Sequence, residues 1–246
     1  MNQNRPVILI TPSDHTFDAE YERRPKFELY KNYGRAVYAA GGMPVMCVET
    51  DLAAEYAKLC DGMVIPGGGG IHPSRYGGVF KEQWVIAGAT NIPRDEMEFS
   101  LFDEFNKRKK PILGICHGFH LINVALGGSL ILNFPKDIGE EHVNGGDHMV
   151  NAVPGSLVHK LFGDRFEVNS YHRNTIDRLA EGLVVTSRSD KGIIESFEHE
   201  SLPLFGYQWH PERARADHQV PNPYRGPDMT PVFEDFIERC RQNREK

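Results

Sequence analysis

The sequence predicts an α/β fold in which a doubly wound, mostly parallel sheet carries helices on both faces and a small antiparallel extension. Short apolar runs at residues 6–10, 62–65 and 111–115 are typical of strands buried on both faces of a sheet. Helical segments separate these runs, and this alternation indicates parallel βαβ units. Nearer the C-terminus, residues 183–187 and 192–198 resemble an antiparallel strand pair, which predicts the extension.

The first part of the chain supplies two helices around a second strand at residues 44–48. Residues 27–40 carry apolar side chains at helical spacing and end at a pair of glycines, a common helix stop. Asp51 is expected to cap a helix that reaches Cys60, because aspartate side chains accept hydrogen bonds from free amides at helix starts.

A third helix is predicted over residues 93–107. Proline stands at its start, and acidic residues follow in its first turn, where negative charge interacts favourably with the helix dipole. We interpret Arg94 and Asp95 as an ion pair at the helix start.

The second half of the chain continues the alternation. Residues 117–126 favour a helix, which a pair of glycines ends. Residues 129–134 read as a strand, residues 150–168 as hairpins, and residues 204–209 as a further buried strand. A helix over residues 231–241 is expected to cover the sheet.

Composition excludes several classes of protein. The chain has 246 residues, of which 40% are hydrophobic and 25% charged, as in ordinary soluble domains. Its 28 basic and 34 acidic residues give a net charge of 28 − 34 = −6, and no basic patch indicates a nucleic-acid or anionic-membrane partner. No segment is apolar for long enough to span a membrane or to resemble a signal peptide.

The four cysteines are widely spaced and include no C-x-x-C pair. This spacing argues against a disulfide framework or a cysteine-based zinc site and predicts a cytoplasmic protein. His142 and His148 lack the spacing typical of metal ligands, so no metal is expected.

A strand, a sharp turn and a helix meet at Cys116. The sequence there is G-x-C-x-G, with Gly114 and Gly118 two positions on either side of the cysteine. This is the nucleophile-elbow pattern with cysteine in place of serine, in which small residues allow strand and helix to approach closely. The helix N-terminus would stabilise a thiolate. The alternative is a buried structural cysteine, the usual fate of a free thiol.

A second stretch, LFGYQWHPE at residues 204–212, supplies partners for such a thiol. Residues i and i+2 of an extended chain share a face, and proline biases the residue before it towards extended geometry. Glu212 could therefore orient the imidazole of His210, which could face Cys116. Nucleophile, base and orienting carboxylate form a triad.

A run of four glycines, residues 67–70, follows the predicted strand at 62–65. Ligand sites of open α/β sheets lie beyond the carboxyl ends of the strands. We expect one wall of an oxyanion hole here, with Gly68 as the donor, and the amide of His117 as the second donor. A flexible turn is the alternative. A phosphate loop is poorly supported, because no Gly-Lys-Ser/Thr follows.

Three stretches together, ILGICHGFHLINVALGG, GYQWHPE and VIPGGGGIHPSRYG, resemble the class I glutamine amidotransferase superfamily. The closer resemblance is to its free-standing γ-glutamyl-γ-aminobutyrate hydrolase family, peptidase family C26, and it runs from Pro6 to about Ile237. It implies one flavodoxin-like domain over residues 1–246, with Cys116, His210 and Glu212 as the catalytic triad. It also implies cleavage of a γ-glutamyl amide through a γ-glutamyl thioester, without a cofactor.

The resemblance further implies which residues lie along the small-molecule substrate. These are Gly67 and Gly69 of the glycine run, together with Ser170, Tyr171 and His172. His172 is also a second candidate base, although the resemblance assigns that segment to substrate binding.

Two positions depart from the family pattern. His117 stands where the hydrolases commonly have arginine, and His120 stands where they usually have the glutamine that contacts the glutamyl group. An imidazole cannot offer the paired donor and acceptor of an amide. His120 is therefore either a substrate contact with altered specificity or a core histidine, and the identity of the leaving amine stays open.

Two other functions remain open. A glutaminase subunit that delivers ammonia to a separate synthetase would carry the same triad, although no synthetase is fused here. A non-catalytic binding protein could keep the fold. The resemblance also implies a homodimer.

Overall fold

A computed structural model describes residues 5–15, 26–78, 90–132, 146–215 and 224–244. The strands are β1 (Val7–Ile10), β2 (Ser13–His15), β3 (Lys26–Glu28), β4 (Met43–Met46), β5 (Gly62–Ile65), β6 (Ile112–Ile115), β7 (Leu130–Ile131), β8 (Gly146–Ala152), β9 (Arg165–Ser170), β10 (Thr175–Ile176), β11 (Leu183–Ser189), β12 (Ile194–His199) and β13 (Leu204–Tyr207). The helices are α1 (Lys31–Ala39), α2 (Ala53–Leu59), α3 (Ile92–Lys107), α4 (His117–Ala125), α5 (Leu157–Phe162) and α6 (Thr230–Arg244).

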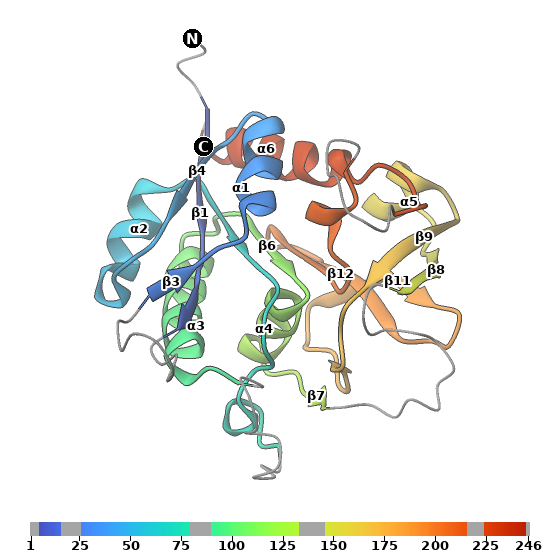
Figure 1. Ribbon diagram of the computed structural model, residues 1–246, viewed down its shortest axis with the longest axis horizontal. Coiled ribbons are helices and arrows are strands. Elements are labelled where there is room, and N and C mark those ends of the chain that lie inside the picture. The colour runs from blue at the N-terminus through green and yellow to red at the C-terminus, as the bar shows by residue number, and fades with distance from the viewer. Residues whose placement is uncertain (1–4, 16–25, 79–89, 133–145, 216–223, 245–246) are drawn as a thin grey trace.

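One nine-stranded sheet organises the molecule, in the order β4-β1-β5-β6-β13-β12-β11-β8-β9 (Figure 1). The strands from β4 to β13 pair in parallel, and those from β13 to β9 pair antiparallel. The parallel part has the flavodoxin-like order 2-1-3-4-5. The predicted fold class is confirmed, and the antiparallel extension adds four strands to it.

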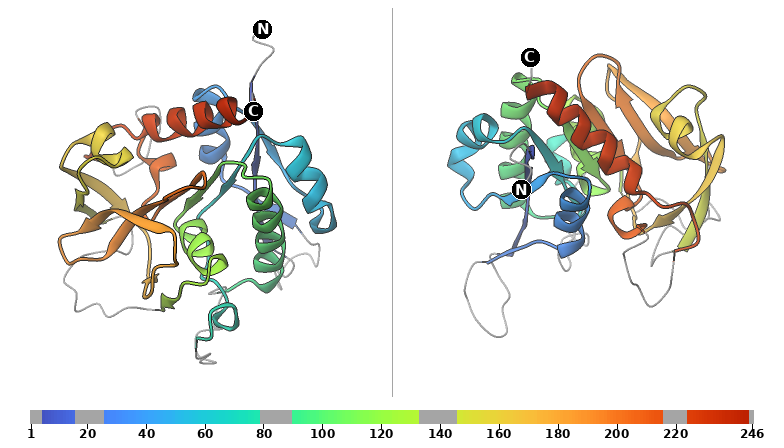
Figure 2. Two further views of the ribbon diagram at one scale, coloured as in Figure 1. Left: turned by 180° about the vertical axis from the view of Figure 1, so that it is seen from behind. Right: turned by 90° about the horizontal axis from the view of Figure 1, so that it is seen from above.

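Apolar residues on alternate positions of the central strands build two cores, one on each face of the sheet. Leu9 and Met63 face one core, whereas Ile8 and Val64 face the other. Helices α2, α3 and α4 cover the first face, and α1 and α6 cover the second (Figure 1, Figure 2). Runs that are apolar at every position are thus explained by burial on both sides. No helix in the described part of the chain is long and apolar enough to cross a membrane.

Three sequence-based expectations about elements were wrong in detail. Helix α1 begins at Lys31 rather than at residue 27, because residues 26–28 form β3 and pair with β2. Asp51 does not cap α2; it lies in a short 3₁₀ turn that precedes the helix. Strands β8 and β9 do pair with each other, but the six-residue helix α5 connects them instead of a tight turn.

The strand expected at residues 129–134 is shorter in the described chain. It comprises β7, two residues that pair with β10, and residues 133 and 134 lie outside the described residues. The predicted helix at residues 93–107 is confirmed as α3, which Asn91 caps by accepting a hydrogen bond from the amide of Arg94 at 3.0 Å.

Candidate active site

Cys116 occupies the sharp turn between β6 and α4. Its φ of 52° and ψ of −93° place a non-glycine residue in backbone geometry that costs about 1–3 kcal/mol. A Cβ atom on Gly114 would lie 2.4 Å from the carbonyl oxygen of Gly118, and one on Gly118 would lie 2.2 Å from that of Ile65. The close approach expected of these two glycines is confirmed, and no larger residue fits the elbow.

Strand pairing brings His210 to the elbow. Strand β13 lies beside β6 in parallel, with Tyr207 opposite Ile115, and the amide of Cys116 donates to the carbonyl of Tyr207 at 2.8 Å. The chain leaves β13 and reaches His210 three residues later. His210 is 3% exposed and Cys116 is 6% exposed, so both are largely shielded from solvent.

The contact expected between His210 and Glu212 is present. The Nδ1 atom of His210 lies 2.7 Å from Oε1 of Glu212, and the carboxylate is fully buried. The expected reason for the contact is wrong, however. The chain does not stay extended beyond His210, since Pro211–Arg213 form a 3₁₀ turn, and this turn folds the carboxylate back onto the imidazole.

The electrostatics of this pair favour a charged imidazole. Burial alone would lower the pKa of His210, but the Glu212 carboxylate and a hydrogen bond with Cys116 outweigh it and raise that pKa to about 9. Burial would raise the pKa of Glu212, but the neighbouring imidazole holds it below its ordinary value. The imidazole of His210 is thus in contact with the Glu212 carboxylate and is influenced by the Cys116 thiol.

Asn169 fixes the backbone of His210. The amide of His210 donates to Oδ1 of Asn169 at 2.9 Å, and Nδ2 of Asn169 donates to the carbonyl of His210, also at 2.9 Å. The ring of Tyr171 stands edge-on to the imidazole, with centroids 5.5 Å apart. The sequence pattern places Asn169 in the segment at 169–172 but indicates no role for it, because strand β9 is remote from His210 in the chain.

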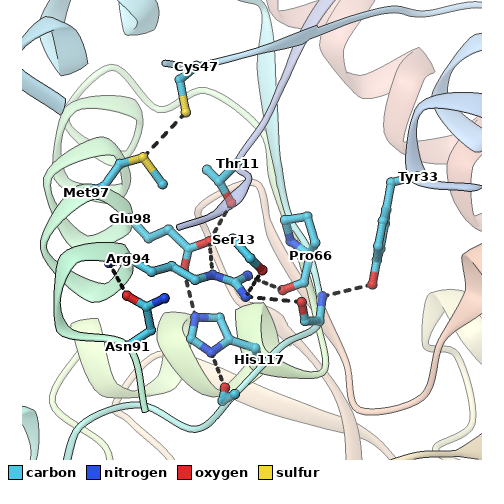
Figure 3. Close-up of polar contacts among 12 residues, drawn as sticks. Thr11, Ser13, Tyr33, Cys47, Pro66, Asn91, Arg94, Met97, Glu98 and His117 are labelled. Atoms are coloured by element: carbon cyan, nitrogen blue, oxygen red, sulfur yellow. Dashed lines mark hydrogen bonds and ion pairs between the residues drawn. The ribbon is translucent and has the colours of Figure 1, made fainter. Parts of the chain in front are cut away.

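Tyr33 joins the glycine run to the imidazole. This fully buried residue of α1 accepts a hydrogen bond from the amide of Gly67 at 2.9 Å (Figure 3). Its hydroxyl lies 3.4 Å from Nδ1 of His210. Burial raises the pKa of Tyr33 well above its ordinary value, so the hydroxyl stays neutral. No sequence signal distinguished this tyrosine from the other apolar residues of its helix.

The two expected oxyanion donors, the amides of Gly68 and His117, stay a prediction, and the structure shows what surrounds them. The amide of Gly67 is already engaged by Tyr33, which leaves Gly68 as the expected donor of the glycine run. The amide of His117 is the first of α4, and the first four amides of a helix have no intrahelical partner. The imidazole of His117 is buried between the carbonyl of Gly69 and the carboxylate of Glu98, at 2.5 and 2.6 Å.

The interpretation of Arg94 and Asp95 as an ion pair was wrong. Arg94 instead pairs with Glu98, one helical turn further along α3, at 3.0 Å (Figure 3). Asp95 accepts a hydrogen bond from the amide of His72 at 2.8 Å. Residues four apart on a helix share a face, whereas adjacent residues do not.

The predicted substrate segment lies at the end of β9. Ser170 is fully buried, whereas Tyr171 is 40% exposed, with the guanidinium carbon of Arg213 4.4 Å from its ring centroid. The Nδ1 atom of His172 lies 3.0 Å from the carbonyl oxygen of Asn174. Tyr171 of this segment and Gly67 of the glycine run both lie beside the imidazole of His210.

His120 has a protein partner. Its Nε2 lies 2.7 Å from Oε1 of Gln208, and burial lowers the pKa of His120 to about 4, so the imidazole is neutral. This geometry favours the core-histidine alternative, and a contact with substrate remains a prediction. Among the described residues, no group of three or more metal-binding side chains is assembled, and His142 lies outside them.

Three known proteins show what the chain is similar to. A Schizosaccharomyces pombe protein named as a suspected glutamine amidotransferase is 34% identical over 85% of this chain and 81% of its own. The γ-glutamyl-γ-aminobutyrate hydrolase PuuD of Escherichia coli is 27% identical over 87% of each. A solved Thermoplasma acidophilum structure, described as that of a suspected GMP synthase component, has a TM-score of 0.66 at 17% identity over 99% of this chain and 98% of its own.

A family model described as Peptidase C26 matches residues 6–212. That match begins before the first strand and ends at Glu212, so it includes both the elbow and the turn that carries His210. The chain belongs to the peptidase C26 family of glutamine amidotransferase-like proteins.

Proposed function

We propose that the protein is a cysteine-dependent hydrolase that cleaves a γ-glutamyl amide, either γ-glutamyl-γ-aminobutyrate or a related γ-glutamyl amine. The observation that carries the proposal is the nucleophile elbow at Cys116 together with the buried His210–Glu212 pair, whose imidazole has a pKa that Glu212 and Cys116 raise. Family membership and the likeness to the E. coli enzyme support a hydrolase. The γ-glutamyl group and the amine are the finer part of the proposal.

In the first half of the reaction, Cys116 attacks the γ-carbonyl carbon as a thiolate. The raised pKa of His210 supports a resting pair in which the imidazole holds the thiol proton. The attack forms a C–S bond and moves the carbonyl π electrons onto oxygen. Amides of Gly68 and His117 stabilise that oxyanion, a contribution of about 3–4 kcal/mol per donor in comparable sites.

The tetrahedral intermediate then collapses. His210 donates its proton to the amine nitrogen, the C–N bond breaks, and a γ-glutamyl thioester remains on Cys116. His210, now neutral, takes a proton from a water molecule that attacks the thioester, and glutamate and the thiolate are released. Glu212 keeps the imidazole oriented throughout, since its contact at Nδ1 leaves Nε2 for proton transfer.

Recognition of the glutamyl group is assigned to the walls around His210. Gly67 and Gly69 form one wall, where Gly67 contributes shape alone because its amide and carbonyl already bond Tyr33 and Arg94. Ser170, Tyr171 and His172 form the other wall. The exposed part of Tyr171 and the neighbouring Arg213 make this side the entrance for the substrate.

A second candidate function is a glutaminase subunit that passes ammonia to a separate synthetase. The observation that favours it is the 34% identity to the S. pombe protein named as a suspected amidotransferase. Both functions require the same chemistry at Cys116, and they differ in the leaving group and in the dependence on a partner.

The test is release of glutamate from a panel of γ-glutamyl amides, glutamine included, by the wild type, Cys116→Ala and Cys60→Ala. Burial raises the pKa of Cys60 to about 11, so its thiol is inert and its removal controls for loss of a cysteine. We expect cleavage of a γ-glutamyl amine by the wild type and Cys60→Ala but not by Cys116→Ala. Turnover of glutamine alone, increased by a partner, would favour the second function, and no turnover of any amide would refute both.

A further inference from the structure

Three carbonyl groups of the segment at residues 66–69 point into one buried polar network (Figure 3). Arg94 donates through Nη2 to the carbonyl of Pro66 at 3.0 Å and through Nη1 to that of Gly67 at 3.3 Å. The Nδ1 atom of His117 lies 2.5 Å from the carbonyl oxygen of Gly69. The segment is therefore fastened by side chains from two different helices, α3 and α4.

Glu98 is the centre of this network. Its Oε1 accepts hydrogen bonds from Nε of Arg94 at 3.0 Å and from the hydroxyl of Thr11 at 2.5 Å, and its Oε2 lies 2.6 Å from Nε2 of His117. Burial would raise the pKa of Glu98, but Arg94 and His117 hold it below its ordinary value. A fully buried carboxylate thus remains ionised because several donors surround it.

The contacts of His117 determine its protonation. A backbone carbonyl can only accept a hydrogen bond, and an ionised carboxylate can only accept one as well. Both ring nitrogens of His117 therefore have to donate, which requires the doubly protonated imidazolium. A neutral imidazole would leave either Gly69 or Glu98 facing a lone pair.

The held carbonyls fix the direction of the amides that follow them. In a trans peptide, the carbonyl of one residue and the amide of the next point in opposite directions, and no described peptide bond is cis. The pair Pro66–Gly67 demonstrates the geometry, since the carbonyl meets Arg94 while the amide donates to Tyr33, whose hydroxyl adjoins His210. With the carbonyl of Gly67 also on Arg94, the amide of Gly68 points away from the network.

We propose that Arg94, Glu98 and His117 are positioning residues that hold the amide of Gly68 in the orientation required to stabilise the oxyanion. This inference rests on the proposed function, in that Cys116 must attack a carbonyl. His117 has two parts in it, because its amide forms one wall of the oxyanion hole and its imidazolium fixes the other wall. The network touches no reacting atom, so its loss should affect the transition state more than substrate binding.

The test compares two reactions of Cys116 that differ in their need for an oxyanion hole. Acetylation by p-nitrophenyl acetate passes through a tetrahedral oxyanion, whereas alkylation by iodoacetamide displaces iodide directly and develops no oxyanion. The ratio of the two rates therefore reports the oxyanion hole without any natural substrate. Burial raises the pKa values of the Cys47 and Cys60 thiols to about 12 and about 11, and it also raises the pKa of the Cys240 thiol, so alkylation reports Cys116.

We expect Glu98→Gln and His117→Gln to lower the acetylation rate about tenfold or more while alkylation stays within about twofold, since loss of a whole donor costs about 10²–10³. His117→Arg should acetylate faster than His117→Gln and close to the wild-type rate, because a guanidinium is always charged and can donate to both Gly69 and Glu98. Glu104→Gln, a partly exposed carboxylate on the same helix, should change neither rate.

Several results would overturn the inference. One is an unchanged acetylation-to-alkylation ratio in Glu98→Gln. A second is an equal fall of both rates, which would mean general damage to the elbow, and a third is a wild type that alkylates at Cys116 but cannot be acetylated. Failure of the proposed function is separate, because it would appear as an absence of γ-glutamyl amide turnover while the ratio still responded to the variants.

Discussion

Asn169→Ala should both destabilise the protein and slow its reaction. The side chain satisfies the amide and the carbonyl of His210, each at 2.9 Å and both buried. Alanine would leave one donor and one acceptor without their partner. An unsatisfied buried group costs about 1–3 kcal/mol, so the free energy of unfolding should fall by roughly 2–6 kcal/mol.

The kinetic effect follows from the same two hydrogen bonds. Without them the backbone of His210 is no longer fixed relative to Cys116, and a displacement of about 1 Å at a reacting group can cost about 100-fold in rate. We expect kcat for the preferred γ-glutamyl amide to fall by about 10- to 100-fold. Urea unfolding measures the change in the free energy of unfolding. Steady-state kinetics, run below the temperature at which the variant unfolds, measure the change in kcat.

Asn151→Ala is the matched control. Asn151 lies exposed on β8, where its amide donates to Asp190 at 2.8 Å, and its removal should change stability by no more than about 0.5 kcal/mol. The reasoning would be refuted if Asn169→Ala were as stable and as active as Asn151→Ala, because the two hydrogen bonds to His210 would then contribute nothing.

Three further predictions concern the pH response and the elbow. Activity should fall as the pH rises through about 9, where His210 loses its proton, and Glu212→Gln should move this limb of the kcat/KM profile to lower pH because burial then acts without the carboxylate. Gly118→Ala should destabilise by more than Gly192→Ala in thermal unfolding. Alanine at 118 would place its Cβ atom 2.2 Å from the carbonyl oxygen of Ile65. Alanine at 192 meets no atom and costs only the strain of a left-handed backbone, about 1–2 kcal/mol. The pKa of His120 falls from an ordinary 6.5 to about 4 on folding, so the unfolded chain binds the extra proton as the pH drops below 6.5. The free energy of unfolding should therefore be about 2 kcal/mol lower at pH 5 than at pH 7 because of His120 alone. In urea unfolding at the two pH values, the free energy of unfolding of His120→Gln should fall by correspondingly less.

The parallel part of the fold was predictable because its signals are local. A run such as ILGI has no polar position at all, and only a strand covered on both faces, here by α4 and α6, accommodates that pattern. The elbow was predictable for a similar reason, since two glycines spaced around Cys116 remove side chains that would strike backbone. In each case the physical requirement lies within a few consecutive residues.

The residues that hold the candidate site in place were not predictable in this way. Tyr33 and Glu98 lie far along the chain from His210 and Cys116, on helices whose sequence pattern reports only which face is buried. Their partners are set by how α1 and α3 pack on opposite faces of the sheet. Likewise, Pro211 indicated rigidity, but whether the chain continued as a strand or turned into a 3₁₀ helix depended on the contacts made around His210.

The register of the central strands explains why these distant residues meet. Segments that follow β1, β5, β6 and β13 emerge from the same edge of the sheet, because those four strands are parallel neighbours. They carry, in turn, Thr11, the segment at 66–69, Cys116 and His210. A shift of one residue in any pairing would move its segment by about 3.3 Å, more than a hydrogen bond can absorb, and would turn its side chains to the opposite face. The strained backbone of Cys116 is therefore held by the pairing of β6 with its neighbours on both sides, and the precision of the proposed chemistry is a property of the sheet as much as of the residues at its edge.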